Sequence, residues 1–150
     1  MKNIFSQEDA TEIINRINNL KANVTPQWGS MNVQQMLAHC NVTFEMEYET
    51  IHPKPNFFIK TILKLFVKKL VVNELPYKKN GQTAPQFIIK DTREFEKEKS
   101  RLIAYIKKTQ VLGENYFDKK ESHSFGVLTA KEWNNLFSKH IDHHLTQFGV

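Results

Sequence analysis

The sequence is poor in residues that cross-link or interrupt a chain: its 150 residues include one cysteine, five glycines and five prolines. The single thiol, Cys40, excludes a disulfide framework within the chain and fits a reducing compartment. Scarce glycine and proline favour long regular elements, and helices more than short strands. With 40% hydrophobic and 25% charged residues, the composition predicts one globular domain, residues 1–150, rather than a disordered segment.

Long apolar runs are also missing. Residues 1–9 contain no apolar core of a signal peptide. The longest apolar stretch, residues 57–72, is interrupted by four lysines and is shorter than the roughly 20 residues that a membrane span requires. We therefore expect a cytoplasmic protein without stable membrane insertion. The stretch could cover the core, lie on a membrane surface or form a homodimer, and the sequence leaves these alternatives open.

An arginine-rich stripe is absent as well, although the formal net charge is +5. The lysines are spread along the chain and often lie near acids, as in residues 93–99. No glycine-aromatic motif of RNA-binding domains occurs. We interpret the positive charge as a solvated basic surface and expect no nucleic-acid partner.

Helical periodicity is the dominant pattern that is present. It predicts helices at residues 6–20, 32–51, 57–72, 92–109 and 129–148, with N-cap residues at Ser6, Asn32 and Thr129. Residues 113–128 are predicted as a loop, and residues 86–89 as at most a short extended piece. The predicted fold class is all-α: a four-helix bundle with one additional helix between the second and third bundle helices.

Three of the six histidines lie close together near the C-terminus. His140 and His144 are four residues apart, so both project from the face of the last helix that carries Trp133 and Phe137. Buried imidazoles are costly unless their nitrogens find partners. A metal ion would satisfy both rings, and this spacing is known among zinc ligands. Hydrogen bonds to the backbone or between the rings would satisfy them too.

His39 lies on the inward stripe of the second predicted helix, between Met36 and Thr43. Alone, such a residue is more often a hydrogen-bonded core histidine than a ligand. The metal hypothesis gains support because two helices of a bundle can face each other and bring His39 to the other pair.

The residues of segments 28–40, 123–133 and 139–149 are similar to the sequence motifs of a known family. The chain resembles the DinB-like superfamily of four-helix-bundle metalloenzymes, and within it a branch of unknown function. The resemblance implies a DinB/YfiT-like bundle and a metal site formed by His39, His140 and His144. Other members are thiol-dependent transferases or isomerases that use mycothiol or bacillithiol, but none of their substrate-contacting residues has a matching motif here.

Three neutral imidazoles would leave coordination positions open, which is typical of catalytic metal sites. We therefore predict a metal-dependent enzyme, a hydrolase or a thiol-dependent S-transferase, that acts on a small-molecule substrate. The expected cofactors are a divalent transition metal, with zinc or nickel first, and a low-molecular-weight thiol. The alternative is a non-catalytic metal-binding or protein-interaction bundle.

The catalytic residues are unknown from sequence. Glu47, two turns beyond His39, and His123, in the loop before the last helix, are candidates for acid–base roles. A solvated helix acid and a packing or capping histidine are the alternatives for these two residues. Asp142 is expected to face outward, and Cys40 to be a small core residue.

Overall fold

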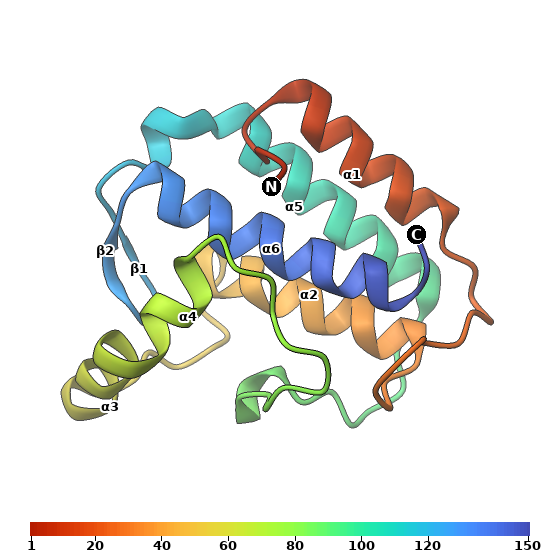
Figure 1. Cartoon of the computed structure of the whole chain (residues 1–150), viewed down its shortest axis with the longest axis horizontal. Helices are drawn as coiled ribbons and strands as arrows, with labels where there is room; N and C mark the ends of the chain where they lie inside the picture. Colours follow the sequence, from red (N-terminus) through yellow and green to blue (C-terminus); the bar gives the residue numbers. More distant parts are fainter.

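Four long helices lie side by side in the computed structural model, which describes residues 1–150 (Figure 1). They are α1 (Gln7–Asn19), α2 (Val33–Tyr48), α5 (Phe95–Phe117) and α6 (Ala130–Gln147). Helices α1 and α2 each pack against both α5 and α6, and apolar side chains from all four helices form one core. The predicted predominance of helix is confirmed.

The three predicted N-cap residues are confirmed in atomic detail, whereas α5 begins at Phe95 and not at the predicted residue 92. Ser6 caps α1 by accepting a hydrogen bond from the backbone N–H of Asp9. Asn32 and Gln35 form a reciprocal capping box at the start of α2, and Thr129 and Glu132 form another at α6. These side chains satisfy backbone N–H groups that have no partner within the helix. Both helices that carry the candidate ligands therefore have a fixed first residue.

Helix α6 is buried on two sides, which makes it the central element of the fold. Phe137 stacks on Phe44 of α2, with ring centroids 4.7 Å apart, and on Trp133, at 5.4 Å. On another side of the same helix, Ile141 and Leu145 are buried as well. Close-packed aromatic and aliphatic contacts hold a helix rigidly. The two histidines of α6 are therefore presented on a well-fixed backbone.

The predicted loop at residues 113–128 is wrong. Helix α5 continues past Thr109 to Phe117, with a kink at Gly113, whose φ of 71° is left-handed. The additional turn buries Phe117 completely, against Phe5 and Trp133. This burial outweighs the tendency of a glycine to end a helix.

A small antiparallel hairpin follows α5. Strand β1 (Lys120–Ser122) pairs with β2 (Gly126–Leu128), with Lys120 opposite Leu128. The Ser122 hydroxyl donates to the Gly126 carbonyl across the turn and stabilises the hairpin. Its strands are too short to show the alternating pattern that would predict them from the sequence. The extended piece considered at residues 86–89 is instead a short 3₁₀ helix, η2 (Pro85–Phe87), followed by extended backbone.

Residues 57–72, which we call the arm, follow α2 and precede α5 in the chain and form a helical projection. The arm consists of α3 (Phe57–Ile62), the π-helical turn η1 (Leu63–Val67) and α4 (Lys68–Val72). The predicted helix is thus confirmed, but it extends away from the body at its α3 end (Figure 1). Neither the arm nor any other helix combines the length and hydropathy needed to cross a membrane.

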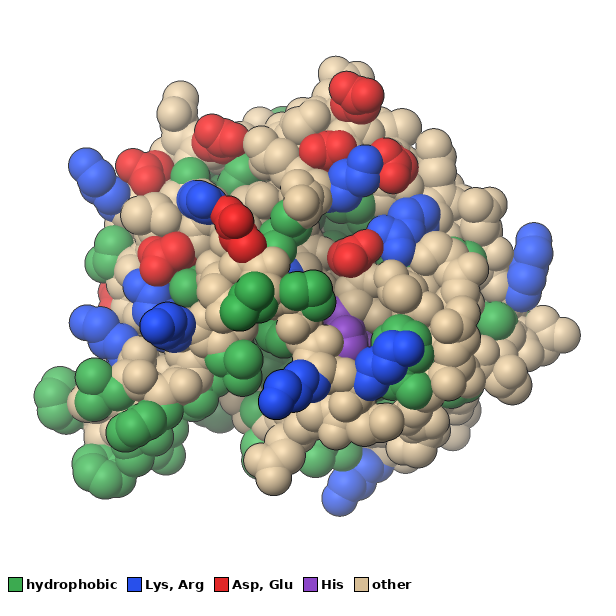
Figure 2. Space-filling model, in the orientation of Figure 1, with side chains coloured by type: hydrophobic (Ala, Val, Ile, Leu, Met, Phe, Trp, Pro, Cys, Tyr) green, Lys and Arg blue, Asp and Glu red, His purple; other side chains and the backbone are tan.

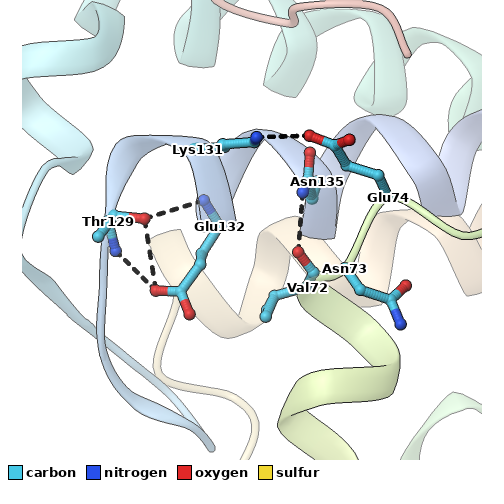
Figure 3. Close-up of a pocket in the computed structure, with 7 residues that line it drawn as sticks. All are labelled: Val72, Asn73, Glu74, Thr129, Lys131, Glu132 and Asn135. Carbon is cyan, nitrogen blue, oxygen red and sulfur yellow. Dashed lines mark hydrogen bonds and ion pairs between the residues drawn. The ribbon is translucent and has the colours of Figure 1, made fainter.

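The α4 end of the arm is anchored to α6. Figure 3 shows the Asn135 side chain on the Val72 carbonyl, a hydrogen bond of 2.8 Å, beside an ion pair of 2.6 Å between Lys131 and Glu74. These residues line a small pocket of about 290 Å³. One turn further along α6, Lys139 Nζ donates to the carbonyl of Leu70 at 2.9 Å. The last carbonyls of α4 therefore receive their hydrogen bonds from α6.

Candidate metal centre

Three imidazoles meet between α2 and α6. His39 comes from α2, and His140 and His144 come from successive turns of α6. Their ring centroids are 4.5–4.9 Å apart, and one nitrogen from each ring lies within 4.8 Å of the others. Two nitrogens on one tetrahedral zinc ion are about 3.3 Å apart, given Zn–N bonds of about 2.0–2.1 Å. The cluster could therefore hold a metal ion.

Hydrogen bonds fix the tautomers of two of these rings. His39 Nδ1 lies 2.9 Å from the carbonyl oxygen of Phe87, and a carbonyl can only accept. The neutral ring therefore carries its proton on Nδ1 and a lone pair on Nε2. His144 Nδ1 lies 2.7 Å from Gln147 Oε1. The Gln147 amide nitrogen donates to the Trp28 carbonyl at 2.6 Å, which keeps Oε1 turned toward the ring. His144 Nε2 is thus also unprotonated.

The tautomer of the third ring can change. His140 Nε2 lies 2.8 Å from His39 Nε2, and His140 Nδ1 lies 2.8 Å from the Thr43 hydroxyl. Two facing lone pairs at this distance repel, so in the metal-free protein a proton must lie between the nitrogens. The proton does so when His140 carries it on Nε2 and Thr43 donates to Nδ1. With the proton on Nδ1, Thr43 accepts it instead, and all three Nε2 atoms present lone pairs.

Burial keeps the three imidazoles neutral. It lowers the pKa of His39, lowers the pKa of His140 well below its usual value, and lowers the pKa of His144 to about 3. Repulsion between neighbouring rings acts in the same direction. Neutral imidazole is the form that binds a metal ion. Protons therefore compete weakly with a metal for these nitrogens near neutral pH.

A cleft of about 1210 Å³ opens onto the three histidines. Figure 2 shows a histidine at the floor of a depression, with hydrophobic side chains and lysine or arginine side chains at its edge. The walls come from α2, from the inner side of the arm, from the segment around η2 and from the hairpin turn; they include Met46, Leu63, Val67, Phe87 and Phe125. Such a mostly apolar cavity with a few converging polar groups is typical of a small-molecule site.

Glu47 and His123 line the same cleft but do not lie among the three histidines. Eight residues separate Glu47 from His39, which is about 12 Å along a helix. Glu47 pairs with Lys120 at 3.2 Å, and burial raises its pKa. His123 Nε2 donates to the His52 carbonyl at 3.3 Å, and its Nδ1 contacts Ser124 Oγ at 2.8 Å. The proposed acid–base roles of both residues stay predictions.

The two remaining residues considered from sequence lie as expected. Cys40 is buried in the core, its Sγ is 3.8 Å from the Met36 sulfur, and burial raises the pKa of the thiol. Asp142 faces outward and pairs with Arg16 at 2.6 Å. Neither side chain is turned toward the cluster.

The partners that orient the rings were not predicted from the sequence. Thr43 is four residues after His39, and Gln147 is three residues after His144. On a helix both spacings bring side chains together, so a search for acceptors at these positions would have found both partners. The Phe87 acceptor is a backbone carbonyl 48 residues away from His39, and no side-chain pattern reveals it.

A family model described as "Protein of unknown function (DUF1569)" matches residues 2–149. The chain belongs to the DUF1569 family. Neither a curated protein nor a solved structure matches this DUF1569 chain. The matched range includes His39, His140 and His144, so the candidate metal centre lies inside the region that defines the family.

Gly29 of the DUF1569 chain leaves room for the glutamine that orients His144. Its φ is +81°, and an added Cβ would lie 2.7 Å from Gln147 Nε2. We expect Gly29→Ala to displace Gln147 and to weaken metal binding about tenfold or more. Gly113→Ala is the matched control, because Gly113 also has a positive φ but its added Cβ would meet nothing within 4 Å.

Both variants should lose about 1–2 kcal/mol of unfolding free energy through the left-handed backbone. Only Gly29→Ala should change zinc affinity, measured by competitive titration with a chromophoric chelator. Equal zinc affinities of the two variants would contradict the role assigned to this contact.

Proposed function

We propose that this DUF1569 protein binds one divalent transition metal through Nε2 of His39, His140 and His144 and is a metal-dependent enzyme. The observation that carries the proposal is the orientation of the rings. Each Nδ1 contacts an oxygen atom of the protein, at 2.7–2.9 Å. This leaves the three Nε2 atoms available to bind one ion beside the cleft. In metal sites, a hydrogen bond from the other ring nitrogen to an oxygen atom fixes the tautomer and the orientation of each histidine ligand.

The ligand set favours catalysis over a structural role. Structural zinc sites are closed by four protein ligands, whereas catalytic sites use three and keep a position open. Imidazole ligands suit zinc or nickel. A bound ion would supply a Lewis acid that acidifies a water molecule or stabilises a thiolate. The apolar cleft walls would exclude bulk water and hold the substrate.

Two reaction classes fit this site: hydrolysis and thiol-dependent S-transfer. The volume of the cleft, about 1210 Å³, exceeds the roughly 300–1,000 Å³ of common ligand pockets. It has room for a small-molecule substrate together with a low-molecular-weight thiol, and this favours S-transfer. We also propose that the arrangement of α1, α2, α5 and α6, with histidines on the second and the last of them, is a DinB/YfiT-like bundle.

The test starts from protein purified without a histidine tag. After reconstitution with zinc or nickel, elemental analysis should find about one equivalent of metal. A screen of esters, amides and electrophiles with low-molecular-weight thiols should then find turnover that a chelator and His144→Ala abolish. Stoichiometric metal without turnover would favour the non-catalytic metal-binding bundle. Less than about a tenth of an equivalent would end the metal hypothesis itself.

A further inference from the structure

The arm exposes large apolar side chains that the rest of the chain does not cover. The exposed fractions are 87% for Phe57, 72% for Phe58, 68% for Leu65 and 75% for Phe66. Figure 2 shows hydrophobic side chains gathered on the projection that contains α3 in Figure 1. A contiguous exposed apolar patch of this kind usually indicates a site that binds a protein, a membrane or a ligand.

The π-helical turn gathers these side chains on one face. In a regular α-helix, residues eight apart are about 80° out of line. The wider turn at Leu63–Val67 has i→i+5 hydrogen bonds and so takes up an extra residue. It turns Leu65 and Phe66 back toward the side of Phe57 and Phe58. The opposite side of the same turn, with Leu63 and Val67, lines the cleft.

The charge around this face has one sign. Residues 51–73 contain five lysines and no aspartate or glutamate. Lys60 and Lys68 pair with Glu121 and Glu132 on the body, at 2.6 and 2.9 Å. The other three, Lys54, Lys64 and Lys69, form no ion pair. A helical face with exposed phenylalanine and leucine beside free lysines is the pattern of a segment that lies in the interface of an anionic membrane.

We propose that the arm docks on the surface of an anionic lipid bilayer. Phe57, Phe58, Leu65 and Phe66 would enter the boundary between headgroups and acyl chains, and the free lysines would contact lipid phosphates. The arm is suited to this because its α4 end is fixed to α6 by Asn135 and Lys139, while its α3 end projects. This inference goes beyond the proposed enzyme and does not depend on it.

A second copy of the chain is the less favourable occupant. In a two-fold interface the same patch meets itself. Phe58 and Phe66 would bring Lys64 and Lys69 against the same lysines of the copy, with no acid within residues 51–73 to neutralise them. Like charges brought together in this way oppose association. Anionic lipid supplies the opposite charge and an apolar phase at once.

Vesicle flotation tests the proposal on the full chain. The protein should float with vesicles of phosphatidylcholine and about 30% phosphatidylglycerol, but not with phosphatidylcholine alone. Binding should fall about tenfold or more in Phe58→Ser/Phe66→Ser, because each substitution removes an aromatic ring whose transfer from water into the membrane is favourable. Lys64→Gln/Lys69→Gln should weaken binding to the anionic vesicles and flatten its dependence on salt. Val111→Ser is the matched control, since Val111 is 79% exposed but lies on α5.

All of these side chains are exposed, so circular dichroism should report unchanged folding in each variant. No flotation of the wild type, or equal flotation of the wild type and Phe58→Ser/Phe66→Ser, would overturn the proposal. Sedimentation that finds a stable dimer, dissociated by the same double substitution, would assign the patch to a second copy instead.

Discussion

Zinc or nickel should raise the melting temperature of the metal-free protein by about 5–10 °C, and His144→Ala should abolish this rise. A ligand that binds only the folded state, present at about 100 times its Kd, adds about 2.7 kcal/mol of unfolding free energy. For a chain of this length each kcal/mol shifts the melting temperature by about 2–4 °C. Without the His144 ring, the remaining two histidines cannot enclose an ion in the same way. Differential scanning fluorimetry in a non-chelating buffer measures the shift.

His143→Ala is the control for this experiment. The His143 ring is 5.0 Å from that of His144, but it packs against Trp28, at 5.7 Å, and lies outside the cluster. This variant should keep the full shift. Equal shifts in His144→Ala and the wild type would show that the ion binds elsewhere. A metal-induced fall in the melting temperature would show that it prefers the unfolded chain.

The helices that carry the candidate ligands could be predicted because their signals are local. Asn32 with Gln35 and Thr129 with Glu132 mark the starts of α2 and α6 within a few residues. Once both helices begin at the right residue, the four-residue step between His140 and His144 fixes their common face. The meeting with His39 requires only that α2 and α6 pack together, as they do.

The parts that sequence reasoning missed depend on contacts between distant segments. The kink at Gly113 is tolerated because Phe117 fills the space beside Phe5 and Trp133. The periodicity of α5 alone does not predict these contacts. The carbonyl of Phe87 reaches His39 because η2 packs on α2. Exposure of the arm was also open, because the same apolar pattern suits a helix that covers a core and one that projects.

Acid should destabilise the metal-free protein steeply below about pH 6.5. Burial lowers the pKa of His39, His140 and His144 in the folded state, whereas histidines of the unfolded chain titrate near about 6.5. Stability is therefore complete above that pH. It falls as the pH drops, since only the unfolded state takes up these protons. The loss from His144 continues down to its folded pKa of about 3.

Each histidine that stays neutral in the folded state contributes about 1.4 kcal/mol per pH unit, so the three together set an upper limit of about 4 kcal/mol per unit. Domains of this kind have about 5–15 kcal/mol of unfolding free energy in total, so a slope near this limit should unfold the metal-free protein within a few pH units below about 6.5. Urea unfolding at several pH values, with a chelator present, measures the number of protons taken up. His144→Ala should reduce that number by about one whatever its own starting stability, because the slope counts titrating groups. An unchanged slope in this variant would mean that the ring of His144 accepts its proton in the folded protein, and that the burial argued for the cluster does not keep it neutral.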